Sequence, residues 1–534
     1  MHYRPLLSVS FVTAAALVAL AGLSGPSLAQ TAAAAAAPPI KPLPLELKCN
    51  PVPFLPDPFK GKLAGPQLPL GIIPVGADDK SKILSLDLPC QDRALPSGPE
   101  DVGLDNLQRT FDFYSWRTFI ALNSPADGKT TIIDSKPDTP TRWENMDNFK
   151  QLLDVMLPAE MQPPEWPADK AGMNAERERL VPKECRKLHQ EMPDRMIVQM
   201  IEESFNEPFK TGPLIDQQGN YAIFDILMNR QMFNYIRGHH LYSKAGQMRA
   251  ANAGLAVDFP PGQNSDGTLG AFMLKVSWKI LGPNEPHPDT FHQVKALVLM
   301  PQPPGDPKAK RPCLPETLGL IGFHAVHKTA SRPQWIWTSF EHFRNVPDKD
   351  EVAAKKFDGP YNFFKINCNG DCPDANATPP RQFWQPDPAL KLKFKDDTFR
   401  SQIVRETPLT DAARHMNDIF HDMLKGTVWV NYMLLSTQWP SVFGCTILHS
   451  QSSEAPAPKT DFLKQPDMTC SPAPTYLANS TLETYSQGKI PQASSSCIGC
   501  HGNAVSFQTG ASSPKPGEVR LNQSDFTFIL EKAQ

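Results

Sequence analysis

The chain carries little excess charge of either sign. Its 534 residues include 53 Lys and Arg against 56 Asp and Glu, which gives a formal net charge of −3 at pH 7. A chain balanced in this way has no basic surface for nucleic acid or for anionic membranes. We therefore expect no nucleic-acid partner.

Several common catalytic patterns are also missing. The sequence contains no G-x-S-x-G, no glycine-rich phosphate loop and no H-E-x-x-H. These patterns supply the nucleophiles, phosphate-binding backbone and metal ligands of many hydrolases and nucleotide-binding enzymes. An interpretation as a hydrolase or a nucleotide-binding enzyme thus has no residues to support it.

Long apolar runs are missing after the N-terminus. The stretch from Val12 to Leu23 follows Arg4 and precedes the small residues of Ser27-Leu28-Ala29. A bilayer span needs roughly 20 apolar residues, whereas a shorter run with these flanks is typical of a secretory signal. We expect residues 1–29 to be a signal peptide, with a retained anchor as the alternative. The mature chain should have no transmembrane segment and lie in the periplasm.

Residues 30–100 are rich in proline and alanine, with 14 prolines in 71 residues. Proline removes backbone donors and blocks regular helix, so this stretch is predicted to be a linker. Residues 101–440 are predicted to form the body. Residues 441–534 are predicted to form a mostly helical or irregular segment that packs on the body.

Hydrophobic periodicity predicts an α+β fold for the body. Helical spacing occurs in 104–123 and in 410–426. The segments 270–281, 291–300, 318–329 and 333–343 alternate or run apolar between loops rich in Pro, Gly and Asp. We therefore expect an antiparallel sheet with packed helices.

The chain contains ten cysteines, and we expect it to be exported. In an oxidising compartment, the eight outside the C-terminal C-x-x-C pair could form up to four disulfides. Eight cysteines allow 105 pairings, so the sequence does not select one. A bond between Cys49 and Cys90 would pin the linker, and Cys368 and Cys372 are close enough for a local bond.

The sequence SSSCIGCHGNA near the C-terminus places Cys497 and Cys500 two residues apart, with His501 directly after. Chance alone would produce roughly 0.005 such matches in a chain with this many cysteines and histidines, and the pattern is that of haem attachment. Two thiols at this spacing lie on one side of a short helical turn. Each can join a porphyrin vinyl group, and the adjacent imidazole can bind the iron.

The CIGCH motif and the following Gly502 resemble the attachment site of c-type cytochromes. A long exported body with a C-terminal CIGCH is also similar to a group of large bacterial mono-haem proteins of unassigned role. The resemblance implies one covalent haem c, thioether links at Cys497 and Cys500, an axial bond from His501, and maturation in the periplasm.

The cysteine pair has two alternative interpretations. A thioredoxin-like dithiol would be expected near a βαβ pattern, which does not surround residue 497. A structural zinc site would need more ligands, to which the CNGDC stretch at 368–372 could contribute. Local disulfide bonding explains that stretch better.

The second axial ligand of the iron must come from upstream. None of the 33 residues after His501 is Met, His or Cys. Met433 is the first candidate, with Met468, Met423 and His449 behind it, and an open position is equally consistent with the sequence. The apolar Phe526, Phe528, Ile529 and Leu530 are too few to enclose a haem, so it should pack against the body.

Other polar groups were assigned structural roles. His324 and His327 lie three residues apart on a predicted strand and should face opposite sides. We expect these two, Glu341 and His342 to be hydrogen-bonded or exposed. Ser480 and Glu483 match a capping box that would open a short helix before the motif.

These observations predict an exported mono-haem c-type cytochrome that transfers electrons, within a periplasmic oxidoreductase, to or from an unidentified redox partner protein. A peroxidase-like haem enzyme with an open distal face is one alternative. A substrate-binding or partner-binding protein with a structural or sensing haem is the other.

Overall fold

The computed structural model divides the chain into two units, Met1–Pro42 and Leu43–Gln534. All the residues that the structure describes belong to the second unit. They are residues 47, 49–50, 84–89, 104–157, 161–205, 207–208, 211–262, 268–300, 310–329, 332–368, 370, 372–379, 386–387, 393–394, 399–440, 472–487, 495–502, 504, 506 and 524–534. The predicted signal peptide and most of the predicted linker lie outside them.

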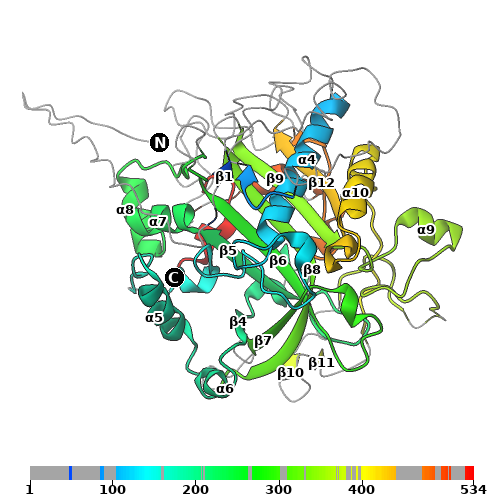
Figure 1. Ribbon diagram of the computed structural model, residues 1–534, viewed down its shortest axis with the longest axis horizontal. Coiled ribbons are helices and arrows are strands. Elements are labelled where there is room, and N and C mark those ends of the chain that lie inside the picture. The colour runs from blue at the N-terminus through cyan, green and yellow to red at the C-terminus, as the bar shows by residue number, and fades with distance from the viewer. Residues whose placement is uncertain are drawn as a thin grey trace, which may run out of the picture. The chain divides into compact units, whose positions relative to one another are not determined.

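A nine-stranded sheet organises the second unit (Figure 1). Its strands are β3 (Phe149–Gln151), β4 (Met196–Gln199), β5 (Ile223–Asn229), β6 (Phe272–Ile280), β7 (Gln293–Leu299), β8 (Cys313–Thr329), β9 (Arg332–His342), β12 (Tyr432–Pro440) and β13 (Pro472–Ala473). The main path runs β13-β12-β9-β8-β6-β5-β3, while β7 pairs with β8 and β4 with β7. Every pairing is antiparallel except that of β4 with β7.

Helices surround this sheet, so the predicted α+β class with an antiparallel sheet is confirmed. The described helices are α4 (Leu104–Asn123), α5 (Lys170–Leu180), α6 (Arg186–Glu191), α7 (Arg230–Gly238), α8 (Lys244–Asn252), α9 (Lys349–Ala354), α10 (Asp411–Met423) and α11 (Cys497–His501). Two small pairs of strands lie apart from the sheet: β1 (Cys49–Asn50) with β2 (Leu88–Pro89), and β10 (Pro386–Asp387) with β11 (Lys393–Phe394).

The predicted helices and strands of the body are confirmed. The helix expected at 104–123 is α4, the one at 410–426 is α10, and the four expected strands are β6 to β9. Just before β12, Val428–Asn431 forms a 3-10 turn.

One face of the sheet, here the α4 face, packs against α4 and α10. Trp116 of α4 stacks on Phe420 of α10 with ring centroids 4.8 Å apart, and it meets Phe340 of β9 edge-on. Phe323 of β8 joins the same buried cluster. Large aromatic side chains on both layers bury much apolar area, which holds the two helices on the sheet.

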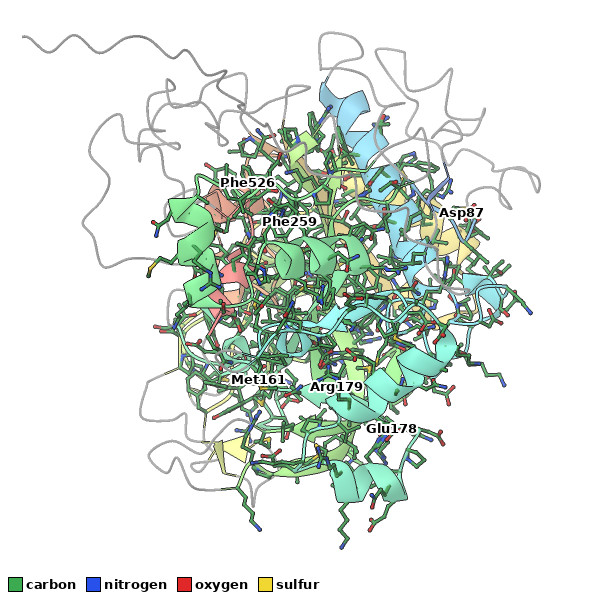
Figure 2. The ribbon with its side chains drawn as sticks, turned by 90° about the vertical axis from the view of Figure 1, so that its left-hand side faces the viewer. Asp87, Met161, Glu178, Arg179, Phe259 and Phe526 are labelled. Carbon is green, nitrogen blue, oxygen red and sulfur yellow. A yellow bond between two sulfur atoms is a disulfide. The ribbon has the colours of Figure 1, made fainter. Side chains whose placement is uncertain are left out.

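The other face, here the cavity face, packs against the C-terminal segment. Met273, Val326 and Trp337 project from β6, β8 and β9 into a second buried cluster, which also contains Ile498 of α11 and Phe526. Figure 2 labels Phe526 near Phe259, a member of the same cluster. Alternation along the strands thus separates one core from the other.

Two disulfides join described cysteines. Cys185 bonds to Cys313 across 128 residues of sequence, and Cys368 bonds to Cys372 as expected. Cys49 lies in β1, opposite Leu88 of β2, while Cys90, Cys445 and Cys470 fall outside the described residues.

Among the helices in the described part of the chain, none has the length and apolar character that a bilayer crossing requires.

Candidate functional site

The CIGCH motif forms helix α11 (Cys497–His501), a single short turn. Ser496 caps its N-terminus, since its hydroxyl accepts a hydrogen bond from the Gly499 N–H at 3.1 Å. A serine at this position satisfies an amide that the helix itself leaves unpaired. Cys497 and Cys500 are free thiols and are not joined to each other.

The three motif side chains line a cavity of about 430 Å³, here the motif cavity. A volume of this size lies within the range of ligand sites, about 300–1,000 Å³. Its walls come from distant parts of the chain: Glu202, Glu203, Glu207, Pro208, Ile226, Lys275, His324, Trp337, Leu477, Glu483, Ser486, Ser496, Phe528, Glu531 and Lys532 complete the lining.

The sheet supplies one wall of the motif cavity through its strand register. Ile226 of β5 pairs with Lys275 of β6, and Lys275 pairs with His324 of β8. Residues directly paired across antiparallel strands share a face and lie side by side. These three side chains therefore form a row, with Trp337 of β9 beside it on the same wall.

His501 is held in one orientation. Its Nδ1 lies 2.9 Å from the Phe526 carbonyl oxygen, and its ring packs against Trp337 and Phe528 with centroids 4.4 and 4.9 Å away. Because a carbonyl only accepts, Nδ1 carries the proton and Nε2 keeps its lone pair. Burial lowers the pKa of His501 to about 3, so the ring is neutral. A neutral imidazole with a carbonyl-bound N–H is the usual form of a metal-binding histidine.

The two thiols border the motif cavity but are otherwise enclosed by protein. Burial, followed by the nearby Glu483 carboxylate, raises the pKa of Cys500 to about 11 and raises that of Cys497 well above its usual value. A reactive dithiol of the thioredoxin kind needs a lowered pKa, because the thiolate is the nucleophile. The environment thus favours uncharged sulfur, which argues against the dithiol interpretation.

Hydrogen bonds hold α11 against the sheet. Gln438 of β12 accepts from the Ile498 N–H at 2.8 Å and from the Ser496 hydroxyl at 3.2 Å. Its amide nitrogen donates to the Pro474 carbonyl at 2.8 Å. The single buried side chain of Gln438 therefore links the helix and the segment before it to the sheet.

The last residues of the chain are anchored by charge as well as by apolar packing. Asp525 is fully buried as a side chain and accepts from Lys328 of β8 at 2.6 Å and from the Phe259 N–H at 2.7 Å. Ile529 and Leu530 are buried in the cluster of the cavity face. A buried, hydrogen-bonded ion pair fixes the position of the backbone from which Phe526 bonds His501.

The segment before the motif follows a different course from the one expected. The predicted capping box is wrong: Ser480 donates through its N–H and its hydroxyl to Glu341, at 3.0 and 2.6 Å. Glu483 instead accepts from the Asn479 N–H at 3.2 Å, and the short helix that follows is the 3-10 turn Thr484–Ser486. The polar residues of 479–483 are thereby used to pack this segment on the cavity face.

Charged and polar side chains surround Glu483 at one end of the motif cavity, here its polar end. Its carboxylate lies 3.8 Å from Lys275 Nζ and 3.6 Å from His324 Nε2. Lys275 also donates to the Leu482 carbonyl at 3.0 Å. Glu207 accepts from the Thr484 N–H and hydroxyl, and burial raises its pKa to about 8.

The two described methionines proposed from sequence, Met433 and Met423, do not line the motif cavity. Met433 is on β12 opposite Glu341 of β9, and the described residues that line the motif cavity do not include it. Met423 is buried on the α4 face with the side chains of α10. Met468 and His449 fall outside the described residues.

The other polar groups weighed from sequence behave as expected, with one exception. His327 bonds to Tyr114 and to the Leu269 carbonyl, and His342 bonds to the Thr290 carbonyl and the Arg344 N–H. Glu341 pairs with Arg405. His324 faces the opposite side from His327, as predicted, but it is buried without a hydrogen bond to its Nε2, and its place in the cavity was missed.

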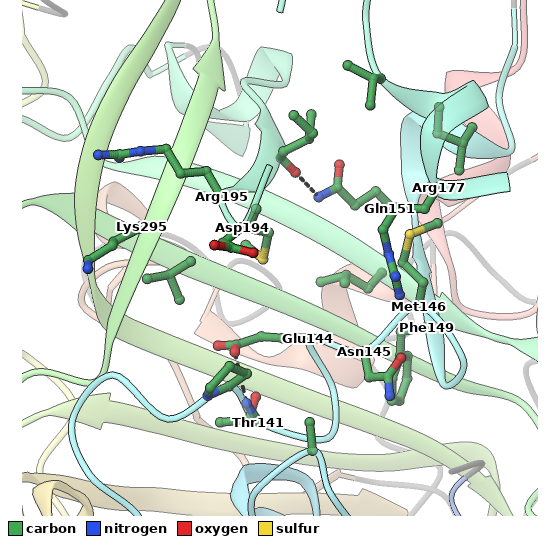
Figure 3. Close-up of a pocket in the computed structure, with 18 of the residues that line it drawn as sticks. Thr141, Glu144, Asn145, Met146, Phe149, Gln151, Arg177, Asp194, Arg195 and Lys295 are labelled. Atoms are coloured by element: carbon green, nitrogen blue, oxygen red, sulfur yellow. Dashed lines mark hydrogen bonds between the residues drawn. The ribbon is translucent and has the colours of Figure 1, made fainter. Parts of the chain in front are cut away.

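A second cavity of about 560 Å³ lies at β3, β4 and β7 (Figure 3). Side chains of both charges line it, among them Arg177, Asp194 and Lys295. Others are bonded to the chain: Gln151 donates to the Ile197 carbonyl at 2.6 Å, and Glu144 accepts from the Thr141 N–H at 2.9 Å. None of its described lining residues belongs to the CIGCH motif.

Searches for similar proteins returned nothing: no family model, no curated protein and no solved structure matches this chain.

Proposed function

We propose that this chain is an exported mono-haem c-type cytochrome that transfers electrons in the periplasm. The observation that carries the proposal is the motif cavity, where two free thiols and a neutral imidazole with an available Nε2 share one enclosure of about 430 Å³. A pair of cysteines and an adjacent histidine is the ligand set of covalent haem.

The residues around the motif suit a flat apolar macrocycle with one polar edge. Ile226, Trp337, Leu477 and Phe528 offer apolar surface on several sides of the cavity. Burying the faces of a porphyrin against such side chains contributes roughly 25 cal/mol per Å² of apolar area. Lys275 and Lys532 lie on the same cavity and could receive carboxylates.

Each thiol has a defined chemical role. Cys497 and Cys500 would hold the porphyrin through two thioethers, in each of which the S–H bond would add across one vinyl group with no atom lost and no oxidant or reductant consumed. His501 would offer Nε2 to the iron, while its Nδ1–H stays on the Phe526 carbonyl. When bound, the haem supplies a one-electron couple between ferric and ferrous iron.

A haem site is favoured over a zinc site because the cysteines of the other close pair are bonded to each other. Cys368 and Cys372 are bonded to each other, so these thiols are not available to complete a zinc set. We expect a periplasmic redox protein as the partner.

The proposal is tested by the mass of the mature polypeptide from a bacterial host able to attach haem c. We expect a gain equal to one haem, and red colour that stays with the chain on a denaturing gel. The double variant Cys497→Ala/Cys500→Ala should lose both signals.

Cys368→Ala/Cys372→Ala is the matched control, because it also removes two cysteines, and it should keep the haem. A wild-type mature chain that weighs no more than its amino acids would refute the proposal. So would an equal loss of haem in both double variants, because attachment would then not depend on the motif.

A further inference from the structure

His324 is a buried histidine whose polar atoms are not fully used. It lies on β8 with 6% of its surface exposed, and it lines the motif cavity together with Cys497, Cys500 and His501. Its Nε2 makes no hydrogen bond and is 3.6 Å from the nearest carboxylate oxygen of Glu483. A buried polar atom without a hydrogen bond is costly to the fold, so it calls for an explanation.

Other histidines of the same sheet have no such deficit. His327, three residues along β8, is bonded through both ring nitrogens, to the Tyr114 hydroxyl and the Leu269 carbonyl. His342 on β9 is also bonded through both. His189 and His292 each leave Nδ1 without a hydrogen bond as well, but neither lines the motif cavity, whereas His324 does.

His324 and His501 line the same cavity, together with Cys497 and Cys500. The register of β8 explains this position. His324 pairs with Lys275 on one side and Ser339 on the other, two residues from Trp337, which packs on the His501 ring.

The other nitrogen and oxygen groups of this end of the cavity are already engaged. Lys275 donates to the Leu482 carbonyl at 3.0 Å. Glu207 accepts two hydrogen bonds from Thr484. Among the described lining residues there is no methionine, so a thioether ligand would have to come from another part of the chain.

We propose that His324 is the second axial ligand of the haem iron, with His501 as the first. This inference rests on the proposed function, because it presumes haem at Cys497 and Cys500. Nδ1 of His324 would bind the iron, and the Glu483 carboxylate, 3.6 Å from Nε2, would accept the Nε2–H. A carboxylate behind a metal-bound histidine fixes its tautomer and strengthens it as a ligand.

Ligation by two imidazoles has consequences that differ from those of the alternatives. The iron would be six-coordinate and low-spin in both oxidation states, with no vacant position for carbon monoxide or peroxide. A methionine in place of one histidine would raise the reduction potential. An open distal face would instead give high-spin iron that binds carbon monoxide.

The test compares ferric spectra and carbon monoxide binding of the holoprotein in wild type, His324→Gln and His327→Gln. We expect a low-spin wild type without carbon monoxide binding. His324→Gln should be high-spin and should bind carbon monoxide, whereas His327→Gln, the matched control on the same strand, should keep the wild-type spectrum. His324→Met should restore low-spin iron at a higher potential.

A measurement on the wild type alone keeps the inference falsifiable if the variants fail to fold. The near-infrared magnetic circular dichroism band of low-spin ferric haem differs between bis-imidazole and imidazole–thioether ligation, and we expect the former. A thioether band, a high-spin wild type, or an unchanged low-spin spectrum in His324→Gln would overturn the role of His324 while the haem remains attached. Absence of covalent haem would overturn the proposed function as well.

Discussion

Gln438 is the side chain whose loss should most selectively release the CIGCH helix. It is fully buried on β12 and makes four hydrogen bonds: with the Ile498 N–H, the Ser496 hydroxyl and the Pro474 carbonyl, and a longer one of 3.5 Å with the Thr475 carbonyl. Methionine has a similar length and no amide, so Gln438→Met keeps most of the packing. It leaves the three closer groups without this partner.

The expected magnitude follows from those three groups. A buried donor or acceptor left unpaired costs roughly 1–3 kcal/mol, and a net hydrogen bond contributes about 0.5–1.5 kcal/mol. Water and small movements will recover part of the loss for Ser496 and Pro474. We therefore expect the free energy of opening α11 to fall by roughly 2–4 kcal/mol, which speeds amide exchange there by roughly thirty- to a thousand-fold.

Hydrogen–deuterium exchange of the purified protein, read on peptides that cover residues 495–502, measures this effect. Gln151→Met is the matched control, since Gln151 donates to the Ile197 carbonyl from β3, at the opposite end of the sheet path. It should leave exchange in 495–502 unchanged. Wild-type exchange rates in Gln438→Met would show that Gln438 does not hold the helix, and equal acceleration in both variants would show a global effect.

Two further substitutions test buried groups on the two faces of the sheet. Burial raises the pKa of Asp112 to about 7, above its ordinary 3.8, so its contribution to stability is present at low pH and is lost as pH rises through 7. Between pH 5 and pH 8, the unfolding free energy of the wild type should fall by about 2–3 kcal/mol more than that of Asp112→Asn. Urea denaturation at several pH values measures both. The same change in unfolding free energy with pH in the two proteins would contradict the prediction. A Cβ at Gly322 would lie 2.4 Å from both Ser277 Oγ and Thr481 Oγ1, so Gly322→Ala should cost about 1–3 kcal/mol in urea denaturation. Gly238→Ala, where a Cβ meets nothing within 4 Å, should be near neutral, and an equal cost in both would argue against close packing of the 479–483 segment.

Elements defined by local patterns were predictable from the sequence. Helix α4 and helix α10 follow from apolar residues at helical spacing, and β6 to β9 follow from alternation and from β-branched and aromatic residues. Ser496 before Cys497 is also a local signal, because serine is a preferred N-cap, and it could have indicated where α11 begins.

Features that depend on strand register were not predictable in this way. His324 was expected to be hydrogen-bonded or exposed. Its neighbours in sequence do not indicate which side chains of other strands lie beside it. Pairing with Lys275 and Ser339, which are 49 residues before and 15 after in the chain, decides its surroundings. The bond between Cys185 and Cys313 is similar, since no local pattern selects a partner 128 residues away.

By itself the sequence determined that Cys497, Cys500 and His501 lie together, since they are near neighbours in the chain and a single helical turn is enough to bring them together. It also determined most helices and strands, whose periodicity is local. Only the tertiary structure decided which side chains share the cavity with His501, because strand register and the packing of residues 472–487, 495–502 and 524–534 bring together side chains from Glu202 to Lys532. Contacts of that kind form between residues far apart in the chain, so they cannot be predicted from the residues adjacent in sequence.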